Sequence, residues 1–262
     1  MNSGPPSTTT SRSRTWRGIK PRRLIATTCA SNNQSMAVSG SVSTSHATHT
    51  EERGTALALL PLVATLLYYV SPLELRQQSL YQFLPQAFAY AALLTWSRLN
   101  TAPAQRLGLA SPPIAQGLRW GTATGLALGM VNLLVILYLV PLLGGDYRFL
   151  ADTPHAKIPL FLMLPWFILF IATMVELNFR GFLLGRLRAL GLPPPLAVPI
   201  SAVLFAFDPF LVATFRHLHW IAIWDGLVWG LLYCRQHNLY TPIVAHTVEV
   251  ILLYVAMRTV LG

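Results

Sequence analysis

Long apolar blocks separated by short polar stretches run along the chain from about residue 55 to its end. A helix that crosses a bilayer needs about 20 predominantly apolar residues. By that measure helices are predicted at about 55–71, 80–97, 120–143, 158–177, 194–212, 218–234 and 239–261. The intervening stretches 98–119 and 144–157 are rich in proline, glycine and charge, which is typical of loops. The pattern predicts an all-α fold, a polytopic membrane helical bundle with about seven transmembrane helices.

The composition supports a membrane protein and argues against a nucleic-acid partner. Only 11% of the residues are charged and 53% are hydrophobic, whereas soluble domains have about 25% charged residues. The net charge is +10, but residues 1–50 hold six basic residues and no acid, so the rest of the chain carries only +4. We therefore expect a lipid bilayer and a membrane protein or peptide as partners, and no nucleic acid.

The first fifty residues differ in composition from everything that follows. They are rich in serine, threonine and arginine and lack acids and an apolar core, which is typical of an organelle transit peptide. The hydroxyl content favours a chloroplast, in its envelope or thylakoid membrane, and a mitochondrial membrane is the alternative. A disordered cytosolic tail also stays open. The predicted organisation is a transit peptide with a disordered linker at 1–50, N-terminal membrane helices and loops at 51–157, and a membrane core at 158–262.

Six ionisable side chains interrupt the apolar blocks of the second half of the chain. They are Glu176, Arg180, Asp208, Asp225, His246 and Glu249. A charged group at the centre of a bilayer costs about 2.5 kcal/mol or more, so such residues usually face the protein interior and carry function. The first three predicted helices hold no charged residue within their apolar stretches, and we expect the polar machinery in the last four.

Two pairs of these residues have helical spacing. Glu176 and Arg180 lie four residues apart and can form an ion pair on one helix face. A purely structural pair at a helix end is the alternative. His246 and Glu249 lie three residues apart, and a carboxylate beside an imidazole orients the ring and raises its basicity. A buried neutral histidine without a catalytic role is the alternative for this pair.

The remaining two acids have less specific surroundings. Asp208 precedes Pro209, so it lies at a kink or at a helix end. Asp225 precedes Gly226 and Gly230, whose spacing permits close contact between helices. The only two cysteines of the chain lie far apart, so a bound metal must use histidine and carboxylate ligands.

ELNFRGFLLGRLRAL resembles the first motif of the CAAX-protease and bacteriocin-processing family of intramembrane proteases, EExxxR followed by GxLxxxL. GLVWGLLYCRQHNLYTPIVAHTVEV resembles the last two helices of that family. The resemblance covers about residues 158–257. It implies a helical bundle with a polar cavity inside the membrane, where a glutamate and histidines activate water for peptide hydrolysis, often with a divalent metal such as zinc.

The resemblance assigns roles to individual residues of this chain. Glu176 matches the second glutamate of the motif, Arg180 its arginine and His246 the histidine of the last motif. Three positions depart from the pattern, because Val175, Pro209 and Val250 stand where the family has a glutamate, a histidine and an asparagine.

Asp208 and Glu249 adjoin two of the altered positions and are candidates for a relocated site. His246 and Asp208 would be its metal ligands, since carboxylate and imidazole both bind zinc. No other cofactor is expected.

Two functions remain open at this point, together with a less favoured third. The first is a membrane endopeptidase, a CAAX-protease-like metalloendopeptidase with a relocated site. The second is a catalytically inactive scaffold or assembly factor with the same fold. The third is a transporter or proton pathway, which would need polar residues in the first three helices as well.

Overall fold

The structure is a computed structural model, and it describes residues 52–110 and 113–261. The chain divides into two units, 1–39 and 40–262, and every described residue belongs to the second. The predicted transit peptide and linker at 1–50 lie outside the described residues and stay a prediction.

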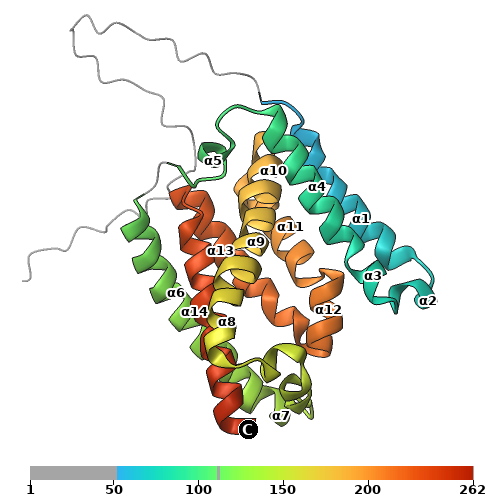
Figure 1. Cartoon of the computed structure of the whole chain (residues 1–262), viewed down its shortest axis with the longest axis vertical. Helices are drawn as coiled ribbons and strands as arrows, with labels where there is room; N and C mark the ends of the chain where they lie inside the picture. The colour runs from blue at the N-terminus through green and yellow to red at the C-terminus, as the bar shows by residue number, and fades with distance from the viewer. Residues whose placement is uncertain (1–51, 111–112, 262) are drawn as a thin grey trace, which may run out of the picture. The chain divides into compact units, whose positions relative to one another are not determined.

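Within the described residues every regular element is helical, as the apolar pattern predicts (Figure 1). The main helices are α1 (Leu59–Val70), α4 (Leu84–Leu99), α6 (Ile114–Leu134), α11 (Pro194–Ala206), α12 (Pro209–Phe215), α13 (Ala222–Gln236) and α14 (Tyr240–Leu261). Short helices are η1 (Thr55–Ala58), α2 (Leu73–Arg76), α3 (Ser79–Gln82), α5 (Pro103–Arg106), η2 (Val135–Leu139), α7 (Val140–Leu142), η3 (Arg148–Asp152), η4 (Pro154–Lys157) and η7 (Arg216–Ile221). One further long helix is built from α8 (Leu160–Trp166), η5 (Phe167–Ala172), α9 (Thr173–Glu176), η6 (Leu177–Leu184) and α10 (Gly185–Ala189).

This last helix, which we call the motif helix, carries Glu176 and Arg180. It runs without interruption over Leu160–Ala189, and its segments η5 and η6 have the wider turns of a π-helix. Seven of the eight η6 residues are buried, and Figure 1 shows the motif helix between the α1–α4 pair and the α6–α14 pair. Wide turns inside an α-helix occur frequently at functional sites. Because Glu176 and Arg180 are fully buried, the motif helix presents these polar residues to the interior of the bundle.

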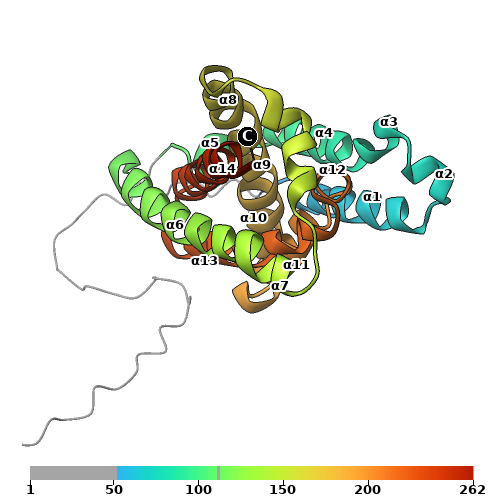
Figure 2. The ribbon, with the colours of Figure 1, turned by 90° about the horizontal axis from the view of Figure 1, so that it is seen from below.

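A stripe of glycines holds α6 against α14. Gly117, Gly121, Gly125 and Gly129 are spaced by four and are all buried. A Cβ atom on Gly125 would lie 2.5 Å from the carbonyl oxygen of Ala245 in α14, so no side chain fits between the two backbones. Small residues at this spacing let membrane helices approach closely. Figure 2 shows α6 beside α14, seen from below.

The helix pair α11 and α13 packs in the same way around glycine. A Cβ atom on Gly226 would lie 2.9 Å from the Cα atom of Ala202 in α11. Between α11 and the continuous stretch from α12 to α13, the chain bends by 53°. Asp208 lies at this bend and is the N-cap of α12, where its side chain accepts hydrogen bonds from the N–H groups of Phe210 and Leu211. The bend is therefore a capped helix start that also contains a proline at the first helical position.

The protein is an integral membrane protein with a helical bundle fold. Within the described residues, three helices are long and apolar enough to cross a membrane: Ile114–Leu142, Leu160–Ala189 and Tyr240–Val260. The bent pair Pro194–Ala206 and Pro209–Gln236 makes a fourth if it counts as one span. Helices lie at all seven predicted places, but α1 has only 12 residues and α4 only 16. The number of seven crossings stays a prediction, because the apolar blocks at 55–71 and 80–97 form helices shorter than a bilayer requires.

Candidate active site

Glu176, Arg180 and His246 meet in the interior of the bundle, and we call these three residues the motif cluster. Oε1 of Glu176 accepts a hydrogen bond from Arg180 Nη1 at 3.0 Å and another from His246 Nδ1 at 2.9 Å. An ionised carboxylate only accepts hydrogen bonds, so His246 carries a proton on Nδ1. Glu176 and Arg180 are fully buried and His246 is 6% exposed. The structure thus brings together two motifs that are 70 residues apart.

Two aromatic residues enclose the motif cluster. Trp229 of α13 stacks on the His246 ring with centroids 4.7 Å apart and planes inclined by 24°. The guanidinium carbon of Arg180 lies 4.4 Å from the ring centroid of Phe205 and 5.0 Å from that of Trp229. A guanidinium above an aromatic face is attracted by the ring quadrupole, more strongly where water is excluded. The rings therefore fix both side chains and separate them from the lipid.

Several polar atoms of the motif cluster have no hydrogen-bond partner among the described residues. They are Oε2 of Glu176 and the Nε and Nη2 atoms of Arg180, and Nε1 of the neighbouring Trp229 has none either. Buried polar groups are nearly always paired in folded proteins. One carboxylate oxygen of Glu176 is thus held by two partners, while the other has none among the described residues.

A second group of buried polar residues lies on the adjoining helices. Asn132 Nδ2 donates to both carboxylate oxygens of Asp225, at 3.2 and 3.1 Å, and to Glu249 Oε1 at 2.6 Å. Trp224 Nε1 in turn donates to Asn132 Oδ1 at 2.7 Å. We call Asn132, Asp225 and Glu249 the acid cluster. Two carboxyl groups converge there on one amide.

The two clusters differ in how their charges are balanced. Glu176 is paired with Arg180, so both can be ionised inside the bundle. Asp225 and Glu249 both accept hydrogen bonds from the neutral amide of Asn132, and among the described residues neither forms an ion pair. Oε2 of Glu249 has no hydrogen-bond partner among the described residues. Arg180 lies near both clusters, because its Nη2 is 3.3 Å from the place of a Cβ atom on Gly226, the neighbour of Asp225.

The close packing of the α6 glycines against α14 determines the position of the acid cluster. Asn132 follows Gly129 by three residues on α6 and belongs to the same buried face as the glycine stripe. That face packs against α14, where His246 and Glu249 lie one turn apart. α14 therefore contributes one residue to each cluster, and the close approach of α6 sets the position of Asn132 beside Glu249.

Asp208 is not part of either cluster. Its Oδ1 accepts hydrogen bonds from the N–H groups of Phe210 and Leu211 and from Gln86 Nε2 at 2.8 Å. It is buried between the bend after α11 and helix α4, away from the Glu176–His246 contact. The relocated site expected from the sequence, with Glu176, Asp208, His246 and Glu249 around one point, is not assembled in this structure. A local rule explains the placement, because an aspartate directly before a proline is a strong helix start.

His246 and Asp208, the metal ligands expected from the sequence, do not meet in a metal site among the described residues. No group of three or more histidine, cysteine, aspartate or glutamate side chains in 52–110 and 113–261 is arranged to hold a metal ion. His246 Nδ1 is engaged by Glu176, and Asp208 caps a helix. Structural and catalytic zinc ions have three or four protein ligands, and the described residues do not provide such a set.

Sequence reasoning missed Asn132. The expectation that the polar machinery lies only in the last four helices is wrong, because this asparagine of the third predicted helix binds both acids. A signal was available in the sequence: Asn132 lies three residues after the last of four glycines spaced by four, on the same buried face of α6. Asp225 was identified as a buried acid of open role, and its partners could not be read from one sequence.

Comparison with known proteins agrees with the quoted motifs. Residues 157–252, over a third of the chain, match the family model described as Type II CAAX prenyl endopeptidase Rce1-like. The matched segment contains Glu176, Arg180, Asp225, His246 and Glu249, whereas Asn132 lies outside it. No curated protein and no solved structure gives a significant match.

Proposed function

Because residues 157–252 place this chain in the CAAX-protease family, we propose that it is an intramembrane endopeptidase with Glu176 as its catalytic base. The observation that carries the proposal is the arrangement of the Glu176 carboxylate. Oε1 is fixed by Arg180 and His246, and Oε2 has no partner among the described residues. A base that is held in place and keeps one oxygen for a proton is what water activation requires.

The proposed reaction is hydrolysis of a peptide bond. Glu176 Oε2 takes a proton from water while the water oxygen forms a bond to the peptide carbonyl carbon. The negative charge that develops on the carbonyl oxygen is stabilised by the free Nε and Nη2 donors of Arg180. When the carbon–nitrogen bond breaks, the proton held by Glu176 passes to the leaving nitrogen, so the products are a carboxylic acid and an amine. His246 orients Glu176 throughout and stabilises its charge through Nδ1–H.

The location of the site specifies the class of substrate. Glu176 and Arg180 lie within Leu160–Ala189, an apolar helix long enough to span a bilayer, and apolar helices surround them. A polypeptide segment that itself enters the membrane is the substrate that can reach such a site. The composition of residues 1–50 supports a chloroplast envelope or thylakoid membrane, and a mitochondrial membrane is the alternative. A fluorescent fusion to residues 1–50 distinguishes these compartments.

A second candidate function is a non-catalytic scaffold or assembly factor of the same family. The observation that favours it is the closure of the motif cluster: Glu176 and Arg180 are both 0% exposed. Val175, Pro209 and Val250 also replace three polar residues of the family pattern. In this function the Glu176–Arg180 pair would persist because removal of either partner leaves a buried charge without compensation.

Genetic rescue separates the two functions without knowledge of the substrate. A strain that lacks the protein receives either the unchanged chain or the variant Glu176→Gln, and an immunoblot measures accumulation. Glutamine keeps the shape and accepts the same hydrogen bonds but is no base. Failure to rescue at normal accumulation supports the endopeptidase. Full rescue contradicts it and supports the scaffold.

Glu74→Gln is the matched control for this experiment. Glu74 lies exposed in the short helix α2 and belongs to neither cluster. It loses the same charge through the same substitution, and we expect it to rescue fully.

A further inference from the structure

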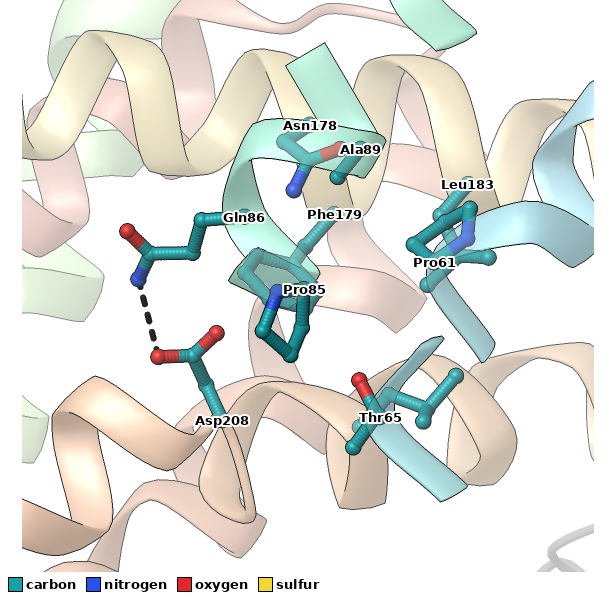
Figure 3. Close-up of a pocket in the computed structure, with 10 residues that line it drawn as sticks. Pro61, Thr65, Pro85, Gln86, Ala89, Asn178, Phe179, Leu183 and Asp208 are labelled. Atoms are coloured by element: carbon teal, nitrogen blue, oxygen red, sulfur yellow. Dashed lines mark hydrogen bonds between the residues drawn. The ribbon is translucent and has the colours of Figure 1, made fainter. Parts of the chain in front are cut away.

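The charged side chains of the described residues fall into an interior group and two groups at the ends of the bundle. The interior group is buried and consists of Glu176, Arg180, Asp208, Asp225 and Glu249. Figure 3 shows one of them, Asp208, directed toward Gln86, which donates a hydrogen bond to it. Because these groups are enclosed, the charges that the protein offers to an outside partner are those at its two ends.

One end of the bundle is rich in arginine, and we call it the arginine face. It is formed by the C-terminal ends of α4, α10 and α13 and by the first turns of α6. Contacts join these ends: Glu52 binds arginines of α5 and α10, and the N–H of Leu239, after α13, donates to the carbonyl oxygen of Gly108, between α5 and α6. Among the described residues its one acid is Glu52, and its seven arginines are Arg53, Arg98, Arg106, Arg119, Arg186, Arg188 and Arg235.

Glu52 neutralises only part of this charge. Its carboxylate lies 3.1 Å from Arg106 Nη1 and 2.6 Å from Arg186 Nε, so two arginines share one acid. Arg98, Arg119 and Arg235 are exposed, and none of them forms an ion pair or a side-chain hydrogen bond with another described residue. The arginine face therefore presents positive charge that the fold does not balance.

The opposite end of the bundle is closer to balance. Arg258 Nη1 donates to the carbonyl oxygen of Ala156 there, and the guanidinium of Arg216 lies over the ring of Phe149. Among the described residues this end has three acids and five basic residues, which are Glu74, Asp146, Asp152, Arg76, Arg148, Lys157, Arg216 and Arg258. The positive excess of the arginine face is thus six charges, against two at the opposite end.

The exposed arginines lie at the level of the lipid headgroups. Arg98 and Arg235 belong to the last turns of α4 and α13. Arg119 lies near the start of Ile114–Leu142, which is long and apolar enough to cross a membrane. Trp120 follows it and is 53% exposed, and tryptophan is enriched where the bilayer meets water. Basic residues at this level attract anionic lipids, each by about a five-fold factor in binding.

The distribution of these arginines around the bundle favours a bilayer over a single protein partner. Arg98 belongs to α4 and Arg119 to α6, and Figures 1 and 2 show these two helices on different sides of the motif helix. A bilayer surrounds the bundle and reaches both sides at once. An acidic protein would need to cover the whole end of the bundle to do the same.

We propose that the arginine face binds the headgroups of anionic phospholipids through Arg98, Arg119 and Arg235. A guanidinium group matches a phosphate group with parallel, charge-assisted hydrogen bonds, and the added negative charge of the lipid compensates the excess of this end. Two of the three arginines, Arg98 and Arg119, lie outside the family-matched segment 157–252. The proposal does not depend on peptide hydrolysis, because none of these residues belongs to the motif cluster.

Electron paramagnetic resonance of spin-labelled lipids tests this proposal. The full chain is reconstituted in phosphatidylcholine vesicles with a trace of spin-labelled phosphatidylglycerol or spin-labelled phosphatidylcholine. The motionally restricted fraction of the label gives the association constant of each lipid with the protein, and their ratio is the selectivity. Both lipids have a phosphate group, but only phosphatidylglycerol has a net negative charge.

Two triple variants with equal changes of charge are compared with the unchanged chain. The test variant combines Arg98→Gln, Arg119→Gln and Arg235→Gln at the arginine face. The control variant combines Arg148→Gln, Lys157→Gln and Arg258→Gln, which replace three exposed basic residues of the opposite end. Far-ultraviolet circular dichroism checks that both variants keep the helix content of the unchanged chain.

The expected result is a preference for phosphatidylglycerol that only the test variant loses. We expect a ratio of association constants of at least about two for the unchanged chain and for the control variant, and of about one for the test variant. Salt at about 1 M shortens the Debye length to about 3 Å and should lower the ratio of the unchanged chain toward that of the test variant.

Three outcomes would overturn the proposal. The first is a ratio of about one for the unchanged chain, which would make an acidic polypeptide the better candidate for the arginine face. The second is an undiminished preference in the test variant, and the third is an equal loss in the control variant. The lipid preference should also be the same in Glu176→Gln, so its failure is distinct from a failure of the proposed hydrolysis.

Discussion

The motif cluster and the acid cluster are neighbours in the same bundle, and they differ in the partners of their carboxyl groups. In the motif cluster a carboxylate is bound by a guanidinium and an imidazole. In the acid cluster two carboxyl groups are bridged by one neutral amide. The first cluster can keep a permanent charge on Glu176, as a base must. The second has no ion pair among the described residues, and its hydrogen bonds join α6, α13 and α14.

The difference shows that a buried charge needs a partner of opposite charge close to it. Removing one partner of a compensated pair leaves a charge in a medium that solvates it poorly. Replacing an acid that is hydrogen-bonded only to a neutral amide removes no ion pair. The two clusters should therefore respond very differently to substitutions of similar size.

The largest effect is expected for Arg180→Leu. The variant leaves Glu176 with no guanidinium and removes the contact with Phe205, so we expect a loss of about 3–5 kcal/mol in the free energy of unfolding. Unfolding in mixed micelles of dodecyl maltoside and dodecyl sulfate, followed by circular dichroism, measures it. Arg98→Leu, at an exposed arginine of α4, is the control and should change stability by about 0.5 kcal/mol or less. An equal loss of unfolding free energy in the two variants would show that the buried, paired arginine stabilises the protein no more than an exposed one.

A smaller loss is expected for Gly125→Ala. Its new Cβ atom would lie 2.5 Å from the Ala245 carbonyl oxygen, which forces α6 away from α14 at a cost of about 1–3 kcal/mol. The shift separates Asn132 from Glu249 but leaves the Glu176–Arg180 pair within one helix. Ala127→Val, on the exposed face of α6, adds bulk without this clash and should leave the midpoint of unfolding nearly unchanged. A comparable loss in this control would show that α6 does not depend on its glycine face.

Asn132→Leu tests the acid cluster directly. Asp225 and Glu249 lose the amide that bridges them, and Trp224 loses its acceptor. Leaving such groups unpaired costs about 1–3 kcal/mol. Asn132→Gln keeps the amide and should recover part of the stability, whereas an unchanged midpoint for Asn132→Leu would mean that the bridge contributes nothing.

The smallest effect is expected for Glu249→Gln. Because Glu249 forms no ion pair among the described residues and accepts its hydrogen bond from Asn132 through Oε1, the amide oxygen of glutamine can accept the same hydrogen bond. We expect a change of about 1 kcal/mol or less, and normal accumulation by immunoblot. A loss as large as that of Arg180→Leu would mean that Glu249 is ionised and compensates a charge.

Much of the fold follows from local rules that one sequence contains. The apolar blocks locate the helices, and the spacing of Glu176 and Arg180 predicts their pairing on one face. The aspartate–proline step at Asp208 could have been interpreted as a helix cap from the same rules. The number of crossings is harder to predict, because an apolar block such as 55–71 does not reveal where its helix ends.

Contacts between segments far apart in the sequence could not be predicted from local rules alone. The resemblance to a family connected Glu176 with His246, since no local pattern links residues 70 positions apart. The meeting of Asn132, Asp225 and Glu249 depends on how α6, α13 and α14 cross. Only the glycine stripe of α6 gave a hint of it, because that stripe determines which face of the helix is buried.

The central claim is that Glu176 hydrolyses peptide bonds inside the membrane. Its most direct test compares protein termini in membranes from strains rescued with the unchanged chain and with Glu176→Gln, at equal accumulation of both. Loss of a general base slows hydrolysis about 10²–10⁴-fold. We predict that the unchanged chain generates at least one new terminus within an apolar segment of a membrane protein, and that the variant does not. Identical termini in the two membranes would contradict the claim.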